Sequence, residues 1–210
     1  MPRTKIPHNV VNSVLIEAGY RCAVPTCRNI LAIDMHHIVE VKDGGPNEPS
    51  NLLALCPTCH ALYTRGTIPK EAINAWKTML VALNHAFDQE SISNLLFLHI
   101  LGQESENRVS RIRNDEEKFK SHERDGQIVE LISYDGAISD LNLLLISGDG
   151  VLKFSHLISS GLAFFYVAVE LGATILYSVQ LTQKGMQIID AWFSGNRQNV
   201  QEALNYLPSN

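Results

Sequence analysis

No cysteine follows Cys59 in this 210-residue chain, and charged residues make up only 19% of it. Low-complexity segments and internal repeats are also missing. A hydrophobic content of 45% with so little charge excludes a disordered chain and is typical of a globular protein. The length suits one or two domains with a packed core.

The sequence also lacks signals for secretion or membrane insertion. The opening stretch, MPRTKIPHNV, has no apolar core of the secretory type, so we expect a cytoplasmic protein. The most apolar window, residues 157–181, contains Glu170 and has no flanking basic cluster. It predicts a buried helix, and no membrane partner is expected.

Charge is unevenly distributed along the chain. The net charge is −5, but residues 1–80 contain 8 Lys and Arg against 6 Asp and Glu, whereas residues 81–210 contain 9 against 16. The N-terminal part is therefore the better candidate for contact with a nucleic acid.

The four cysteines form two close pairs, Cys22-x4-Cys27 and Cys56-x2-Cys59. Two such pairs are the pattern of a tetrahedral Zn²⁺ site. Two disulfides or buried thiols are the alternatives, and the missing secretion signal makes disulfides less favoured. A structural zinc would supply folding energy that a module of about sixty residues cannot draw from its small core.

Hydrophobic patterns predict an α+β chain. Residues 8–19 predict a short helix that stops at Gly19, residues 29–41 a β-hairpin, and residues 69–90 an amphipathic helix that begins at Pro69 and carries one apolar stripe. Residues 105–124 are almost entirely polar and indicate a solvated helix or a linker.

These patterns divide the chain into three regions. We expect an N-terminal module over 1–68, a helical connector over 69–125 and a small α+β domain over 126–210. In the last region, YSVQLTQKGMQIIDAW resembles the tail of winged-helix domains, where an LTxKG turn leads into a helix. Thr182 is the predicted N-cap of that helix. The acidic balance of this region argues against a DNA-gripping wing, so regulation, partner docking or dimerisation is the predicted role.

Polar residues recur between the cysteine pairs, at His36-His37, Asn51 and His60, with a Gly-Gly loop before Asn51. With these residues, the stretch from CAVPTC through IDMHHIVEVKDGGPNEPSNLLALCPTCHALYTRG resembles the HNH endonuclease family, the ββα-metal nucleases. The cysteines match its zinc-knuckle subgroup. The resemblance covers about a fifth of the chain.

The resemblance implies a role for each polar residue. Phosphodiester hydrolysis needs an activated water and a cation at the phosphate. His37 is the candidate general base, because an imidazole is largely neutral at cell pH. Neighbouring strand residues face opposite sides, and the resemblance implies that His36 binds the catalytic metal together with His60. Asn51 would tie the loop to the hairpin. A rival interpretation makes His36 or His60 a ligand of the zinc ion in place of a cysteine.

Position 64 departs from the family pattern. Many relatives carry a further histidine four residues after the last motif histidine, where this chain has Thr64. Two imidazoles and several waters suit Mg²⁺ or Mn²⁺, so we expect one of these as the catalytic ion. Arg28, Lys42 and Arg65 are the candidate nucleic-acid contacts, with ordinary surface charge as the alternative for each.

The sequence thus predicts a metal-dependent endonuclease that cuts double-stranded DNA with little sequence preference. Regulation through residues 126–210, a homodimer or partner protein bound there, and a part in bacterial restriction or anti-phage defence are expected by analogy. The alternative is a zinc-stabilised module that binds nucleic acid or docks a partner without catalysis. An enzyme that cuts RNA is a third possibility.

Overall fold

The computed structural model of the chain describes residues 5–120, 144–171 and 173–208. It combines helices with two small antiparallel sheets, which confirms the predicted α+β class. Every helix in the described part of the chain is too short or too polar to cross a lipid bilayer.

The chain divides into two compact units. Unit 1 comprises Met1–Ile92 and Gln187–Asn210, and unit 2 comprises Ser93–Met186. The end of the chain therefore belongs to the same unit as its beginning. The three-domain division made from the sequence stays a prediction, and residues 126–143 of its last domain lie outside the described residues.

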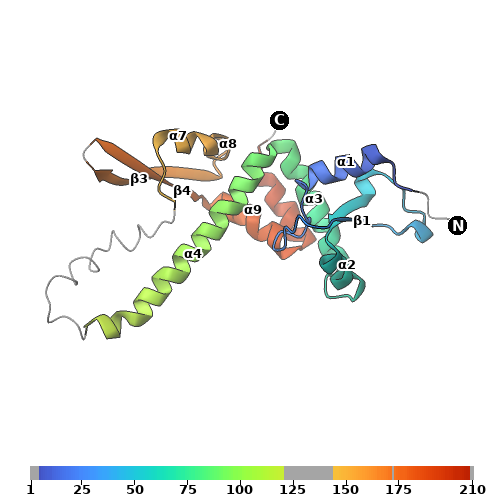
Figure 1. The fold of residues 1–210 in the computed structure, drawn as a ribbon, viewed down its shortest axis with the longest axis horizontal. Coiled ribbons are helices and arrows are strands. Elements are labelled where there is room, and N and C mark those ends of the chain that lie inside the picture. The colour runs from blue at the N-terminus through green and yellow to red at the C-terminus, as the bar shows by residue number, and fades with distance from the viewer. Residues whose placement is uncertain (1–4, 121–143, 172, 209–210) are drawn as a thin grey trace. The chain divides into compact units, whose positions relative to one another are not determined.

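The sheet of unit 1 pairs β1 (Asp34–His37) with β2 (Leu52–Leu55), and α2 (Pro57–Thr64) follows directly (Figure 1). The strands are antiparallel, with His36 opposite Leu53 and His37 opposite Leu52. Two single-turn 3₁₀ helices, Val41–Asp43 and Pro49–Asn51, lie in the loop between the strands.

The hairpin predicted within residues 29–41 is wrong, because only the part from Asp34 to His37 is a strand. The side chain of Asn29 accepts a hydrogen bond from the Leu31 amide at 2.8 Å, and Leu31 is 89% exposed. This local turn competes with strand pairing. The second strand comes instead from the fully buried residues after Asn51.

Helix α1 (His8–Glu17) covers the sheet, as its apolar spacing predicts. Val14 and Ala18 are buried against Leu52 and Ala54 of β2. Gly19 follows with a φ of +63°, a left-handed conformation that suits glycine and ends the helix.

Helix α3 (Lys70–Ala86) joins the N- and C-terminal parts of unit 1. Its predicted apolar stripe is confirmed, with Ile73 and Leu83 fully buried. It contacts α10 (Arg197–Ala203), and the Arg197 amide donates to the Glu71 carboxylate at 3.3 Å. Leu204–Tyr206 form a final 3₁₀ turn.

The described elements of unit 2 include a second antiparallel pair. Helix α4 (Gln89–Lys120) leads into unit 2. It is followed in chain order by α7 (Gly148–Val151), the 3₁₀ turn Leu152–Phe154, α8 (Ser155–Ser159), β3 (Ala163–Leu171) and β4 (Thr174–Leu181). Helix α9 (Gln183–Ser194) leads back into unit 1. The buried helix predicted over 157–181 is wrong, since most of this window is the β3–β4 pair. Its aromatic and β-branched residues favour strands.

The turn between β4 and α9 confirms Thr182 as a helix N-cap. Its hydroxyl accepts a hydrogen bond from the Gly185 amide at 3.2 Å and donates to the Gly161 carbonyl at 2.7 Å. A Cβ on Gly185 would lie 2.3 Å from the Leu162 carbonyl oxygen, so only glycine fits there. The wider likeness to a winged helix stays a prediction.

Candidate functional site

The four cysteines converge at one point of unit 1. Their Sγ atoms all lie within 4.8 Å of one another, and those of Cys27 and Cys56 are 3.7 Å apart. A Zn–S bond of about 2.3 Å implies Sγ–Sγ distances of about 3.8 Å around a tetrahedral ion. None of the four forms a disulfide. The donor set therefore fits a zinc ion, as the spacing predicts.

Backbone contacts bring the two cysteine pairs together. Cys56 is the N-cap of α2, and its Sγ accepts a hydrogen bond from the Cys59 amide at 3.4 Å. The loop that carries Cys22 and Cys27 is held beside β2, because the Ala23 amide donates to the Ala54 carbonyl at 2.8 Å. Strand β2 and the start of α2 thus position all four sulfur atoms.

Burial disfavours the ionisation of Cys22 and Cys59. Burial raises the pKa of Cys22 to about 11 and also raises the pKa of Cys59. Burial also opposes ionisation of Cys56, but hydrogen bonds from Cys59 outweigh it and lower the pKa of that thiol. Thiolates are the form that binds metal, so a bound divalent ion would stabilise charges that burial alone disfavours.

A cleft of about 670 Å³ opens beside β1 and α2. Its lining residues are Met35, His36, His37, Glu40, Val41, Lys42, His60, Tyr63 and Thr64. The two neighbouring histidines were expected on opposite faces of a strand, but both border this cleft. Both lie at the end of β1, whose last residue is His37.

His36 is the buried histidine of the cleft. Its side chain is 5% exposed, and its Nε2 has no hydrogen-bond partner. Its ring centroid lies 5.1 Å from that of His60 and 4.4 Å from that of Tyr63. Burial, then the charges that His60 and His37 can carry, lowers the pKa of His36 to about 4. A neutral imidazole with an unused nitrogen is suited to binding a metal ion.

His60 lies on the first turns of α2 and faces the same cleft. Its Nδ1 is 3.9 Å from a carboxylate oxygen of Asp34, which precedes His36 by two residues on β1. Thr64 donates its hydroxyl to the His60 carbonyl at 3.0 Å, an ordinary helix contact. Among the described residues, His36 and His60 therefore offer two neighbouring imidazoles to a metal ion, with the Asp34 carboxylate near His60; His37 and Glu40 also line the cleft.

Asn51 binds the loop between the strands at two places. Its Oδ1 accepts from the Val39 amide at 2.8 Å, and its Nδ2 donates to the carbonyls of Val39 and Pro46 at 3.0 Å each. It is 7% exposed, so these bonds are shielded from water. The contacts agree with the loop-tying role that the family resemblance implies, and that role stays a prediction.

The loop also supplies a direct partner for His37. The Nε2 atom of His37 lies 2.8 Å from Oδ1 of Asn47. Both side chains are half-buried. Asn47 lies one residue after Pro46, so the loop that Asn51 fixes also carries the residue that contacts His37.

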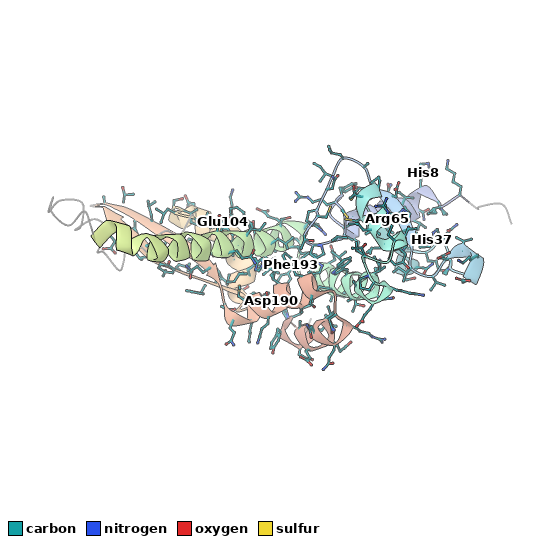
Figure 2. All side chains as sticks on the ribbon, turned by 90° about the horizontal axis from the view of Figure 1, so that it is seen from below. His8, His37, Arg65, Glu104, Asp190 and Phe193 are labelled. Atoms are coloured by element: carbon teal, nitrogen blue, oxygen red, sulfur yellow. The ribbon has the colours of Figure 1, made fainter. Side chains whose placement is uncertain are left out.

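The three candidate nucleic-acid contacts differ in placement. Lys42 is exposed at the cleft, where its Nζ pairs with Glu40 at 2.9 Å, and Arg65 is exposed at the end of α2 (Figure 2). The Arg28 guanidinium lies 5.9 Å from the Trp192 ring centroid, and its Nε and Nη1 are buried without a partner. Burial, with a smaller effect of Arg21, lowers the pKa of Arg28 to about 10. This placement favours packing over phosphate binding.

Three residues that contact the histidines of the site were not predicted from the sequence: Asp34, Asn47 and Tyr63. The period-two spacing of Asp34 and His36 on a strand could have indicated a shared face. Asn47 lies in an irregular loop and Tyr63 on a helix, and neither position carries a signal that distinguishes it from ordinary surface or packing residues.

The comparisons with known proteins agree with this geometry. Residues 22–66 match the family model "HNH endonuclease". Over 50 residues the chain is 34% identical to Anaredoxin of Nostoc sp. (strain PCC 7120 / SAG 25.82 / UTEX 2576), covering 24% of this chain and 64% of that protein. No solved structure matches. HNH membership suggests a nuclease. Residues 22–66 of this chain therefore form an HNH endonuclease domain, with four cysteines placed to bind a metal ion as in a zinc-knuckle module.

Proposed function

We propose that the HNH domain hydrolyses phosphodiester bonds of double-stranded DNA with the help of a divalent ion. The observation that carries the proposal is the buried, unpartnered Nε2 of His36 beside His60, in a cleft that His37 also borders. Leaving a buried polar atom without a partner is costly, and a metal ion bound to Nε2 of His36 would offset that cost.

In this mechanism His36 and His60 hold Mg²⁺ or Mn²⁺, which supplies positive charge at the scissile phosphate when it is bound. His37 accepts a proton from the attacking water, and Asn51 keeps the loop around His37 in place. Cys22, Cys27, Cys56 and Cys59 hold a separate structural zinc that stabilises the module. Arg65 and Lys42 contact neighbouring phosphates, so binding carries little sequence preference.

The remaining expectations extend this proposal. We propose that residues 126–210 regulate the nuclease or form a dimer or partner interface, which their acidic balance supports. A dimer would present two sites for a double-strand break, since one HNH site cuts one strand. A cytoplasmic part in restriction or anti-phage defence follows by analogy with bacterial proteins of this layout.

A plasmid-nicking assay on the zinc-loaded full chain tests the proposal. With Mg²⁺ or Mn²⁺ we expect the wild type to convert supercoiled plasmid to nicked circles, and His37→Ala to lose this activity while keeping its zinc and its fold. His8→Ala is the matched control, because His8 is exposed at the start of α1, outside the cleft (Figure 2).

The same assay separates the alternatives. A zinc-stabilised binding module without catalysis predicts no nicking at any protein concentration, with either metal. Cleavage by His37→Ala at the wild-type rate would refute the role of His37. Parallel reactions on single-stranded DNA and RNA test the choice of double-stranded DNA, and a preference for RNA would overturn that part of the proposal.

A further inference from the structure

We infer that Asn47 is a positioning residue that fixes the ring orientation and tautomer of His37, so that Nδ1 is the atom that takes the proton. The role of Asn47 in catalysis rests on the proposed nuclease function, whereas its contact with His37 does not depend on that function. The observation is the 2.8 Å contact between His37 Nε2 and Asn47 Oδ1.

The chemistry of the two atoms determines where the proton lies. An amide oxygen only accepts hydrogen bonds, so the His37 Nε2 that faces it must carry the hydrogen. A neutral imidazole has one N–H, and Nδ1 therefore keeps its lone pair. A general base must offer a lone pair to water in the correct direction, which a freely rotating ring offers only part of the time.

The surrounding loop keeps Asn47 next to His37. Asn51 donates to the Pro46 carbonyl, next to Asn47, and bonds both backbone groups of Val39, two residues after His37. These bonds do not involve the Asn47 side chain. A substitution of Asn47 should therefore release the His37 ring while the loop and the zinc site stay folded.

Three variants separate orientation from simple packing. Asn47→Leu keeps the branching at Cγ but has no acceptor, whereas Asn47→Asp keeps an oxygen that can accept the Nε2 hydrogen. Asn47→Ser tests the effect of shortening the side chain. Zinc content and thermal unfolding of each full-length, zinc-loaded protein show whether the fold is retained.

The direct readout is NMR of ¹⁵N-labelled histidine rings without a catalytic metal, with the His37 signals assigned by their loss in His37→Ala. We expect a protected Nε2–H signal for His37 in the wild type and Asn47→Asp, and exchange broadening of that signal in Asn47→Leu. A His37 ring protonated on Nδ1 in the wild type would overturn the inference. So would a protected Nε2–H signal that is unchanged in Asn47→Leu.

Plasmid cleavage gives the functional readout. We expect Asn47→Leu to lower kcat by about 10–100-fold with little change in KM, a typical cost of losing a partner that orients a site imidazole. Asn47→Asp should restore most of the rate, and Asn47→Ser should fall between the two. An Asn47→Leu rate equal to that of the wild type would overturn the inference. If the wild type cuts no nucleic acid, the proposed function fails, and the NMR signals decide the role of Asn47 by themselves.

Discussion

Gly45 occupies a position in the HNH loop that has no room for a side chain. A Cβ on Gly45 would lie 1.8 Å from the Val39 carbonyl oxygen and 2.8 Å from Nδ2 of Asn51. Both neighbours are held in the network around Asn51, so neither can move aside without breaking hydrogen bonds. We therefore expect Gly45→Ala to disrupt the loop that carries Asn47.

The size of the effect follows from the bonds at risk. The Gly45 amide donates to the Glu40 carbonyl at 3.0 Å, and Asn51 Nδ2 donates to the carbonyls of Val39 and Pro46 at the same distance. Each bond contributes about 1 kcal/mol net. The alanine also lowers the conformational entropy of the unfolded chain, which offsets about 0.4–1 kcal/mol of this loss. We expect Gly45→Ala to lower the free energy of unfolding by about 2–3 kcal/mol.

Gly44→Ala is the matched control. Gly44 has a φ of +85°, but a Cβ there would meet nothing within 4 Å. Its cost is the strain of a left-handed alanine, about 1–2 kcal/mol, less the same entropic return. The two variants therefore separate crowding from backbone strain one residue apart.

Urea unfolding of the zinc-loaded full chain, followed by tryptophan fluorescence, measures both variants. Both tryptophans of the chain, Trp76 and Trp192, lie in unit 1, so the signal reports on the unit that contains the loop. The reasoning is refuted if Gly45→Ala is as stable as the wild type, or is less destabilising than Gly44→Ala.

Two further predictions concern the zinc site and the helix packed near it. Cys56→Ser removes one zinc ligand but keeps a hydroxyl that can cap α2, so we expect loss of bound zinc by elemental analysis and loss of cooperative unfolding; retained stoichiometric zinc would contradict the assigned ligand set. Trp192→Ala empties a fully buried site beside Arg28 and should cost about 3–5 kcal/mol, measured by urea unfolding through the fluorescence of Trp76. Phe193→Ala, at a partly buried neighbour, should cost less; equal costs would refute the packing argument.

Local sequence signals predicted the elements that depend on neighbouring residues. The apolar spacing of α1 and α3, the stop at Gly19 and the Thr182 cap all correspond to the structure. These features succeed because helix periodicity and capping depend on residues a few positions apart. The hairpin predicted from residue 29 fails because β1 pairs with β2, whose residues lie beyond the predicted range. The buried helix predicted over 157–181 fails because its aromatic and β-branched residues form the neighbouring strands β3 and β4.

The sequence by itself determined which residues are the candidates for the chemistry. The two cysteine pairs, His36-His37, Asn51 and His60 occur in an order that indicates an HNH domain, and the family match covers the same residues. That information lies in the residue types and their spacings, which can be read from the sequence without a structure.

Only the tertiary structure decided how these residues are arranged. It places both histidines of the pair in one cleft, leaves the His36 Nε2 without a partner, and brings Asn47 to His37. It also shows that Arg28 packs on Trp192, a residue far from it in the sequence. The physical reason is that such contacts depend on where a strand ends and how a loop returns, and Asn51 and Gly45 fix that path through hydrogen bonds and close packing.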